Sequence, residues 1–193
     1  MYLGFPVSCV AMQPTLIIAI RAARAAGRIL MRYLDRVDQL HIQAKSQNDF
    51  VTEVDRAAED AIIHELRSKY PNHAILAEES GAHGKGDFQW VIDPLDGTTN
   101  YLHGFPQFSI SIALRHRGRL ECGIVYDPLR EEMFTAERGG GAQMNDRRIR
   151  VANRLGLEGA LIGTGFPFRD QRQLDTYLAM FRTMILNTAG LRR

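Results

Sequence analysis

The hydrophobic periodicity of the chain changes at His73, and this change most constrains the fold. Within residues 15–34, and again within 54–66, apolar residues recur at helical spacing, which predicts two amphipathic helices. From His73 onward the apolar runs are short, and over residues 108–114 they alternate with Ser and Ala, as in a half-buried strand. Helices followed by an antiparallel meander favour an α+β layered domain.

The remaining elements follow from local signals. The second helix is predicted to start after Thr52 as its cap, with Asp55 at its third position, and a polar linker ending at Asp49 precedes it. Buried strands are expected at residues 74–77, 88–92, 120–126 and 132–136. After Gly159 a strand at 160–163 and a helical stripe of apolar residues predict the first βα unit of a second layer; the stripe comprises Leu174, Tyr177, Leu178 and Phe181.

These signals predict three regions. Residues 12–152 are expected to form an N-terminal α+β metal-binding domain, and 153–193 the start of a truncated C-terminal α/β layer. Because Met12-Gln13-Pro14 opens a well-formed helix, we expect translation to begin at Met12 and residues 1–11 to be a disordered extension. Gly4, Pro6 and Pro14 interrupt the apolar N-terminus, which argues against a signal peptide or membrane span.

The composition is that of a globular protein in a reducing compartment. Of the 193 residues, 45% are apolar and 24% are charged, which is ordinary for a soluble domain. The net charge of +2 is too small to indicate nucleic acid or an anionic membrane as a partner. Cys9 and Cys122 match no metal or redox spacing, so we expect a cytoplasmic protein without membrane association.

The run from Trp90 to Asn100 carries the strongest chemical signal. An apolar strand ends at Asp93, Pro94 blocks further pairing, and Asp96 follows three residues after Asp93, with the Leu95 carbonyl between the two carboxylates. Such hard oxygen ligands suit Mg²⁺. Gly97 would let the backbone approach a phosphate closely at the start of a helix that runs through Thr98 and Thr99. The alternative is a strand-to-turn connection in which Asp caps the backbone.

A second acidic site lies at another strand end. Glu78 follows the apolar strand at 74–77, so Glu78, Asp93 and Asp96 would gather around one phosphate-sized pocket. Clustered carboxylates repel each other, and cations are their natural partners. This arrangement meets the requirement of two-metal phosphate hydrolysis. A third group contains Lys45, Asp49, Thr52 and Asp55, for which helix capping and a solvated loop are an adequate explanation.

These segments, in order and spacing, resemble the inositol monophosphatase family, most closely its bacterial extragenic suppressor branch. The resemblance rests on KSQNDFVTEVD (45–55), AEESG (77–81) and WVIDPLDGTTNY (90–101), and it extends from about Met12 to Arg193. It implies a layered αβαβα sugar-phosphatase fold, usually a homodimer, that hydrolyses phosphate monoesters with two or three Mg²⁺ and is inhibited by Li⁺. Inositol monophosphate is the expected substrate, with histidinol phosphate or a sugar phosphate as alternatives.

The resemblance also implies residue roles. Glu78, Asp93 and the Leu95 carbonyl would hold the first magnesium, and Asp93 and Asp96 the second. Glu78 and Thr98 would position the attacking water. The phosphate and substrate would be bound by Asp96, Gly97, Thr98 and Thr99. Lys45, Asp49, Thr52 and Asp55 match the segment that supports the metal site.

The chain lacks the motifs of the family's other half, namely Gly-Ser-Ala-Ala and Trp-Asp-x-Ala-Ala-Gly. The family pattern would continue after Arg193 for about 70–80 residues, so we expect a truncated protein whose second metal site is incomplete. A catalytically impaired remnant is therefore one alternative. Another is a partner role of the transcription-antitermination type, with RNA polymerase contacts through exposed arginines such as those at 115–119 and 147–150.

Overall fold

The computed structural model describes residues 13–36, 42–46, 49–153, 155–167 and 171–192. For residues 42–46 and 49–52 it describes the backbone and not the side chains. The expected extension at 1–11 and the start at Met12 lie outside this range. The chain divides into two compact units, one of residues 1–43 and 50–149 and the other of 44–49 and 150–193.

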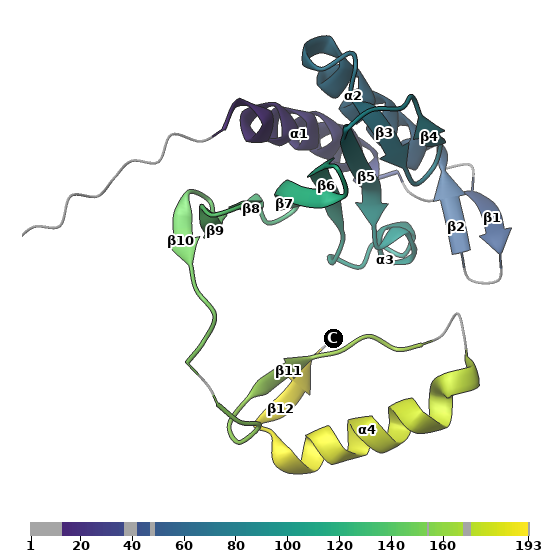
Figure 1. The fold of residues 1–193 in the computed structure, drawn as a ribbon. Coiled ribbons are helices and arrows are strands. Elements are labelled where there is room, and N and C mark those ends of the chain that lie inside the picture. The colour runs from purple at the N-terminus through teal and green to yellow at the C-terminus, as the bar shows by residue number, and fades with distance from the viewer. Residues whose placement is uncertain (1–12, 37–41, 47–48, 154, 168–170, 193) are drawn as a thin grey trace, which may run out of the picture. The chain divides into compact units, whose positions relative to one another are not determined.

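The first unit is a mixed eight-stranded sheet with two long helices packed on it (Figure 1). The long helices are α1 (Pro14–Leu34) and α2 (Glu53–Lys69), and a short helix, α3 (Thr98–Leu102), follows β5. The strand order is β10-β9-β8-β7-β6-β5-β3-β4. The strands are β3 (Ala74–Ala77), β4 (Gly81–His83), β5 (Phe88–Asp96), β6 (Ser109–His116), β7 (Arg119–Asp127), β8 (Glu132–Glu137), β9 (Gly141–Met144) and β10 (Arg147–Ile149).

The predicted meander is confirmed from β5 to β10, which pair antiparallel in sequence order. Strand β3, by contrast, pairs parallel with β5, with Ala77 opposite Ile92. The carboxyl ends of β3 and β5 therefore lie at the same edge of the sheet. The prediction of a linker without secondary structure before α2 was wrong. This segment contains a two-stranded sheet of β1 (Ile42–Ser46) and β2 (Asp49–Thr52).

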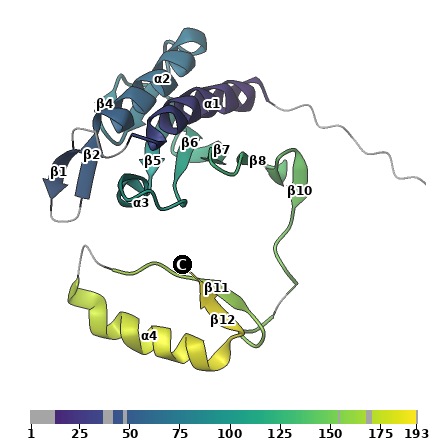
Figure 2. The same cartoon turned by 180° about the vertical axis from the view of Figure 1, so that it is seen from behind.

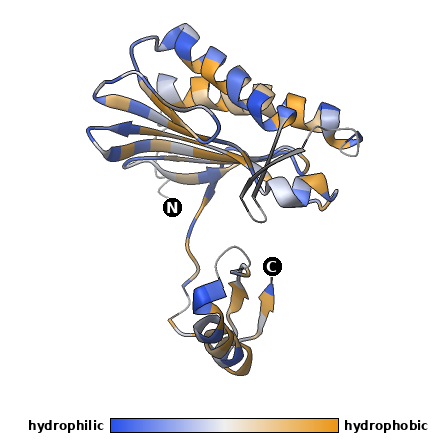
Figure 3. Ribbon diagram, turned by 90° about the vertical axis from the view of Figure 1, so that its right-hand side faces the viewer, coloured by the Kyte–Doolittle hydropathy of each residue, from blue (hydrophilic) through white to orange (hydrophobic). Residues whose placement is uncertain are grey.

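Apolar side chains between the helices and the sheet form the core of this unit. The predicted stripes of both helices are buried, and the strands add the alternate residues that face them, including Trp90, Ile112 and Ile124. Gly27 allows α1 to approach the sheet, since a Cβ there would lie 2.7 Å from the Tyr126 ring. Figure 2 shows the same helices from behind, and Figure 3 shows hydrophobic and hydrophilic residues alternating along them and along the strands.

The second unit contains a parallel βαβ arrangement. Strand β11 (Leu161–Gly163) pairs with β12 (Gly190–Arg192), and α4 (Leu174–Asn187) connects them after a short 3-10 helix at Gln171–Gln173. The predicted strand and helix of this segment are thus confirmed. No helix in the described ranges has both the length and the apolar character needed to cross a bilayer.

Candidate functional site

The end of β3 and the last part of β5 bring Glu78 and Asp93 together, as the sequence predicted. The predicted strand end at Asp93 was wrong, because β5 continues past an irregularity to Asp96, which pairs with Ser109. Glu78 directly follows β3, and its amide donates a hydrogen bond of 3.1 Å to the Ile92 carbonyl of β5. This bond continues the parallel β3–β5 ladder by one residue and places Glu78 beside the end of β5. The side chains of Glu78 and Asp93 are within hydrogen-bonding range of each other, and Asp96 is close enough to act on Asp93 electrostatically.

The electrostatics of Asp93 show that acidic groups are crowded together at this site, which disfavours negative charge on Asp93 in the absence of a cation. The pKa of Asp93 is raised from 3.8 to about 7, first by burial, then by the charge of Glu78 and a hydrogen bond with it, and then by the charge of Asp96. The hydrogen bond of 3.1 Å from the Leu95 amide to Asp93 Oδ1 acts in the opposite direction. A divalent cation would relieve this repulsion, and carboxylate oxygens are ligands that Mg²⁺ prefers.

The geometry falls short of a complete metal site. Among the described residues, no three His, Cys, Asp or Glu side chains are grouped closely enough to hold a metal ion. The chemistry of the donor set nevertheless fits one: Glu78 and Asp93 are adjacent, and Asp96 is exposed on the next turn of the chain.

A second Asp-Pro-Leu sequence in this chain tests whether backbone capping explains Asp93. Asp127 ends β7 and a turn follows it, whereas Asp93-Pro94-Leu95 lie in the irregular last part of β5. In both segments the Asp accepts a hydrogen bond from the amide of the Leu two residues on, at 2.9 Å for Asp127 and 3.1 Å for Asp93. Asp127 also accepts the Arg130 amide and pairs with the Arg130 side chain at 2.5 Å, whereas Asp96 adds a second negative charge beside Asp93. Capping therefore accounts for Asp127, while the unneutralised carboxylates around Asp93 require another reason.

Thr98 connects the site to α2. Its hydroxyl lies 3.1 Å from the Leu95 carbonyl and 3.3 Å from Asp55 Oδ1, so its single proton can be donated to either oxygen. Asp55 is buried at 1% exposure on the face of α2 that packs on the sheet. When the proton is donated to Asp55, the Leu95 carbonyl, an expected metal ligand, keeps both of its lone pairs.

Gly97 and α3 directly follow the carboxylates of β5 in the chain. Gly97 has φ of 93°, and a Cβ there would lie 3.0 Å from the Gln107 carbonyl, so a side chain is excluded on both counts. The helix predicted to follow Gly97 is confirmed, although α3 spans only Thr98–Leu102. It is anchored from below by the Tyr101 hydroxyl, which donates 2.7 Å to the Leu30 carbonyl of α1.

Glu59 is a positioning residue that the sequence analysis missed. It is 2% exposed, and its two carboxylate oxygens accept hydrogen bonds from the Glu79 and Ser80 amides at 2.8 and 2.9 Å. It thereby fixes the turn that presents Glu78. The signal was present in the sequence, because Asp55 and Glu59 are acidic residues on the otherwise apolar stripe of α2.

The other predicted residues are placed only in part. Thr99 is half-buried in α3, and its carbonyl contacts His103 Nδ1 at 2.7 Å. Lys45, Asp49 and Thr52 lie on β1 and β2, where the side chains are outside the described residues, so their supporting roles stay predictions.

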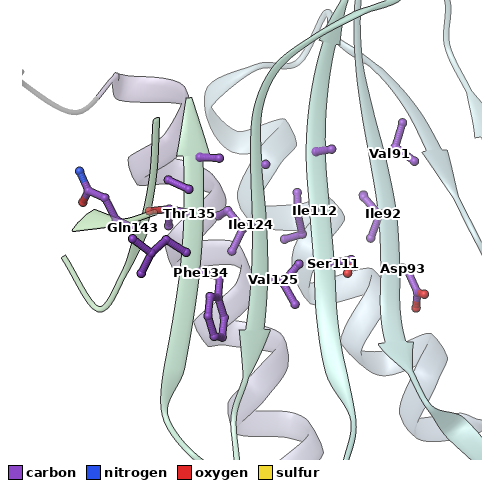
Figure 4. Close-up of a pocket in the computed structure, with 15 residues that line it drawn as sticks. Val91, Ile92, Asp93, Ser111, Ile112, Ile124, Val125, Phe134, Thr135 and Gln143 are labelled. Atoms are coloured by element: carbon purple, nitrogen blue, oxygen red, sulfur yellow. The ribbon is translucent and has the colours of Figure 1, made fainter. Parts of the chain in front are cut away.

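A cavity of about 440 Å³ borders Asp93 on the face of the sheet away from α1 and α2 (Figure 4). Its lining is mostly apolar, with Val91, Val125 and Phe134 pointing into it, and Asp93 is at its edge. A phosphate monoester needs polar and charged partners, so this cavity does not suit the substrate. The residues predicted to bind the phosphate lie elsewhere, around Asp93, Asp96 and Gly97 in the last part of β5 and just after it.

Comparison with known proteins identifies the family. Residues 11–192 match the model of the inositol monophosphatase family. A "Nus factor SuhB" of Pseudomonas aeruginosa is 56% identical over 188 residues, which cover 94% of this chain and 69% of that protein. A protein of the same name from Pasteurella multocida is 53% identical, with the same coverage.

Solved structures show the same fold. The extragenic suppressor protein suhB of Bartonella henselae is 41% identical and superposes with a TM-score of 0.90 over 94% of this chain and 70% of that one. An IMPase of Thermotoga maritima is 36% identical and has a TM-score of 0.81 over 93% of this chain and 68% of that one.

Proposed function

This chain belongs to the inositol monophosphatase family, and from that premise we propose that it hydrolyses a small phosphate monoester, with inositol monophosphate as the first substrate to test. The observation that carries the proposal is the contrast between its two Asp-Pro-Leu segments. Asp127 is neutralised by Arg130, whereas Asp93 has added negative charge beside it from Glu78 and Asp96. Such a cost in stability is typical of a ligand-binding site.

In the proposed mechanism, Glu78, Asp93, the Leu95 carbonyl and Asp96 would hold magnesium. The bound ion would activate water and stabilise the leaving oxygen. Glu78 accepts a proton from the attacking water, and the Thr98 hydroxyl orients that water while Asp55 orients Thr98. The Gly97 and Thr98 amides receive the phosphate, and Asp96, which is exposed, contacts the hydroxyls of the substrate.

The test is magnesium-dependent phosphate release from inositol 1-phosphate by this 193-residue chain. Asp93→Asn should reduce turnover by about a hundredfold or more, since it removes a ligand shared by both ions. Asp127→Asn is the matched control, because it makes the same substitution in the chain's other Asp-Pro-Leu sequence. It should leave turnover within about threefold, since its effect is expected only on folding. Li⁺ should inhibit the wild type. Absence of turnover in a folded sample, or equal losses in both variants, would refute the proposal.

Substrate choice is tested in the same assay of phosphate release. Histidinol phosphate and a sugar phosphate should be compared with inositol 1-phosphate by kcat/KM, since this ratio measures discrimination between substrates. We propose that inositol 1-phosphate has the highest ratio. A higher ratio for either competitor would leave the proposed phosphatase activity in place and replace inositol 1-phosphate as the proposed substrate.

We propose a second role, in contact with the transcription machinery, because relatives at 47–56% identity are named Nus factors. RNA polymerase is the expected partner, which would place the protein in the cytoplasm, and a homodimer is the expected assembly. Substituting exposed arginines at 115–119 and 147–150 should weaken co-purification with RNA polymerase, and Asp93→Asn should not. If Asp93→Asn weakens it equally, the two roles are not separate; sedimentation at several concentrations tests the dimer.

A further inference from the structure

Helix α1 carries a row of exposed arginines, Arg24, Arg28 and Arg32, here called the arginine row. The helix contains no Asp or Glu, and its buried side consists of Leu, Ala and Gly. At 3.6 residues per turn the three positions fall within about 80° of the helix circumference, and they span about 12 Å of its length. The opposite, buried side packs on α2 and the sheet, so the row is fixed on a rigid support.

The row is largely unpaired. Arg21, one turn earlier, forms an ion pair of 3.2 Å with Glu65 of α2. In the described part of the chain, no ion pair involves any of the three arginines in the row. Two carboxylates, those of Glu131 and Asp146, share a small polar cavity with Arg24 and offset part of its charge. Arg28 and Arg32 are not among the residues that line that cavity.

We propose that the arginine row binds the phosphodiester backbone of a nucleic acid. Guanidinium groups bind phosphate oxygens in a bidentate manner and are less strongly hydrated than ammonium groups. A regular series of them on one helix face matches a ligand with regularly repeated charges. The row presents no group arranged to read base edges, so binding should be independent of sequence. The small net charge of +2 does not oppose this, because the positive charge is concentrated on one helix face.

Other anionic partners fit the surface less well. A helix that lies on a membrane needs an exposed apolar face to insert, and Ile17 is the one large apolar residue of α1 recorded as exposed in the described chain, at 46%. A protein interface needs an apolar or aromatic centre, which the outward face of α1 also lacks. The proposal is independent of the phosphatase function, because none of the three arginines belongs to the carboxylate site.

The test is the salt dependence of binding to labelled single strands of about 20 nucleotides, measured by fluorescence anisotropy with the whole chain. One arm uses RNA and the other DNA of the same sequence. The variant R24Q/R28Q/R32Q removes three charges from the row. The matched control, R115Q/R119Q/R147Q, removes three charges from the basic segments at 115–119 and 147–150. A third variant, R24K/R28K/R32K, keeps the charge.

We expect the wild type to bind, with affinity that falls as salt rises. In R24Q/R28Q/R32Q the slope of log K against log salt should shrink by about 2, because each phosphate contact on a single strand contributes about 0.7. The lysine variant should retain most of the slope, and the matched control should retain all of it. Binding that is absent, insensitive to salt, or weakened equally in the control would overturn the proposal, as would binding to anionic vesicles alone. A preference for RNA or DNA would identify the natural source of the backbone.

Discussion

Replacing Glu59 with Gln tests whether the buried face of α2 positions the carboxylates of the proposed metal site. Each carboxylate oxygen of Glu59 accepts one backbone amide, from Glu79 and Ser80. The Gln carbonyl can replace one acceptor, but its amide group would present a donor to the other backbone N–H. A buried donor without an acceptor costs about 1–3 kcal/mol, and hydrogen bonds to a charged group contribute about 1.5–3 kcal/mol each. We therefore expect Glu59→Gln to lower the free energy of unfolding by about 2–3 kcal/mol.

The assay is urea unfolding followed by circular dichroism, with Glu65→Gln as the control on the same helix. Glu65 pairs with Arg21, whose side chain is 56% exposed, and such pairs contribute about 1 kcal/mol or less. A loss in Glu59→Gln no larger than in Glu65→Gln would refute the reasoning. In a magnesium titration of phosphatase activity, Glu59→Gln alone should need more magnesium for half-maximal rate, because the turn that presents Glu78 is no longer fixed.

Three further substitutions test the same site. Burial and two neighbouring carboxylates raise the pKa of Asp93 to about 7, so ionising it costs the folded state stability as pH rises from about 4 to 7. Asp93→Asn should therefore raise the free energy of unfolding at about pH 8 in EDTA by on the order of 1 kcal/mol, after allowance for solvent screening. A calorimetric midpoint no higher than that of the wild type would contradict this. Gly97→Ala should destabilise by about 1–3 kcal/mol, because φ is 93° and the Gln107 carbonyl is 3.0 Å from the new Cβ; an unchanged urea midpoint would count against it. Tyr101→Phe should cost about 1 kcal/mol by losing the bond to Leu30, with kcat nearly unchanged, and a large fall in kcat with normal stability would show a catalytic role instead.

Much of the fold could be predicted because its signals are local. Helices and strands with a clear hydrophobic pattern could be identified from their own residues, and the structure confirms them. These are α1, α2 and the strands predicted at 74–77, 88–92 and 132–136. The start of α2 after Thr52 was equally readable from its capping pattern. What could not be read was pairing between distant strands, since nothing near β3 states that it lies parallel to β5.

The positions of the candidate carboxylates could also be predicted from local signals. Glu78 and Asp93 each follow an apolar run, Asp96 comes three residues later, and residues at strand ends are often available to bind a ligand. Glu59 was missed because its partners are backbone amides twenty and twenty-one residues later, and a backbone amide leaves no mark in a sequence. The β1–β2 sheet was missed because its segment is polar and short, so periodicity does not separate it from a loop.

The contacts around the site explain how the protein tolerates adjacent carboxylates. Glu59 fixes the turn carrying Glu78, the β3–β5 ladder fixes Asp93, and neither can move away to relieve the repulsion. The cost is therefore retained in the folded chain until a cation binds. A ligand that binds only the folded state stabilises it by RT ln(1 + [L]/Kd). Magnesium should accordingly stabilise the wild type against unfolding, and Asp93→Asn should lose this effect while being the more stable protein in EDTA. That reversal of order between the two conditions would not arise if Asp93 were only a cap for its turn, because a cap contributes equally with and without magnesium.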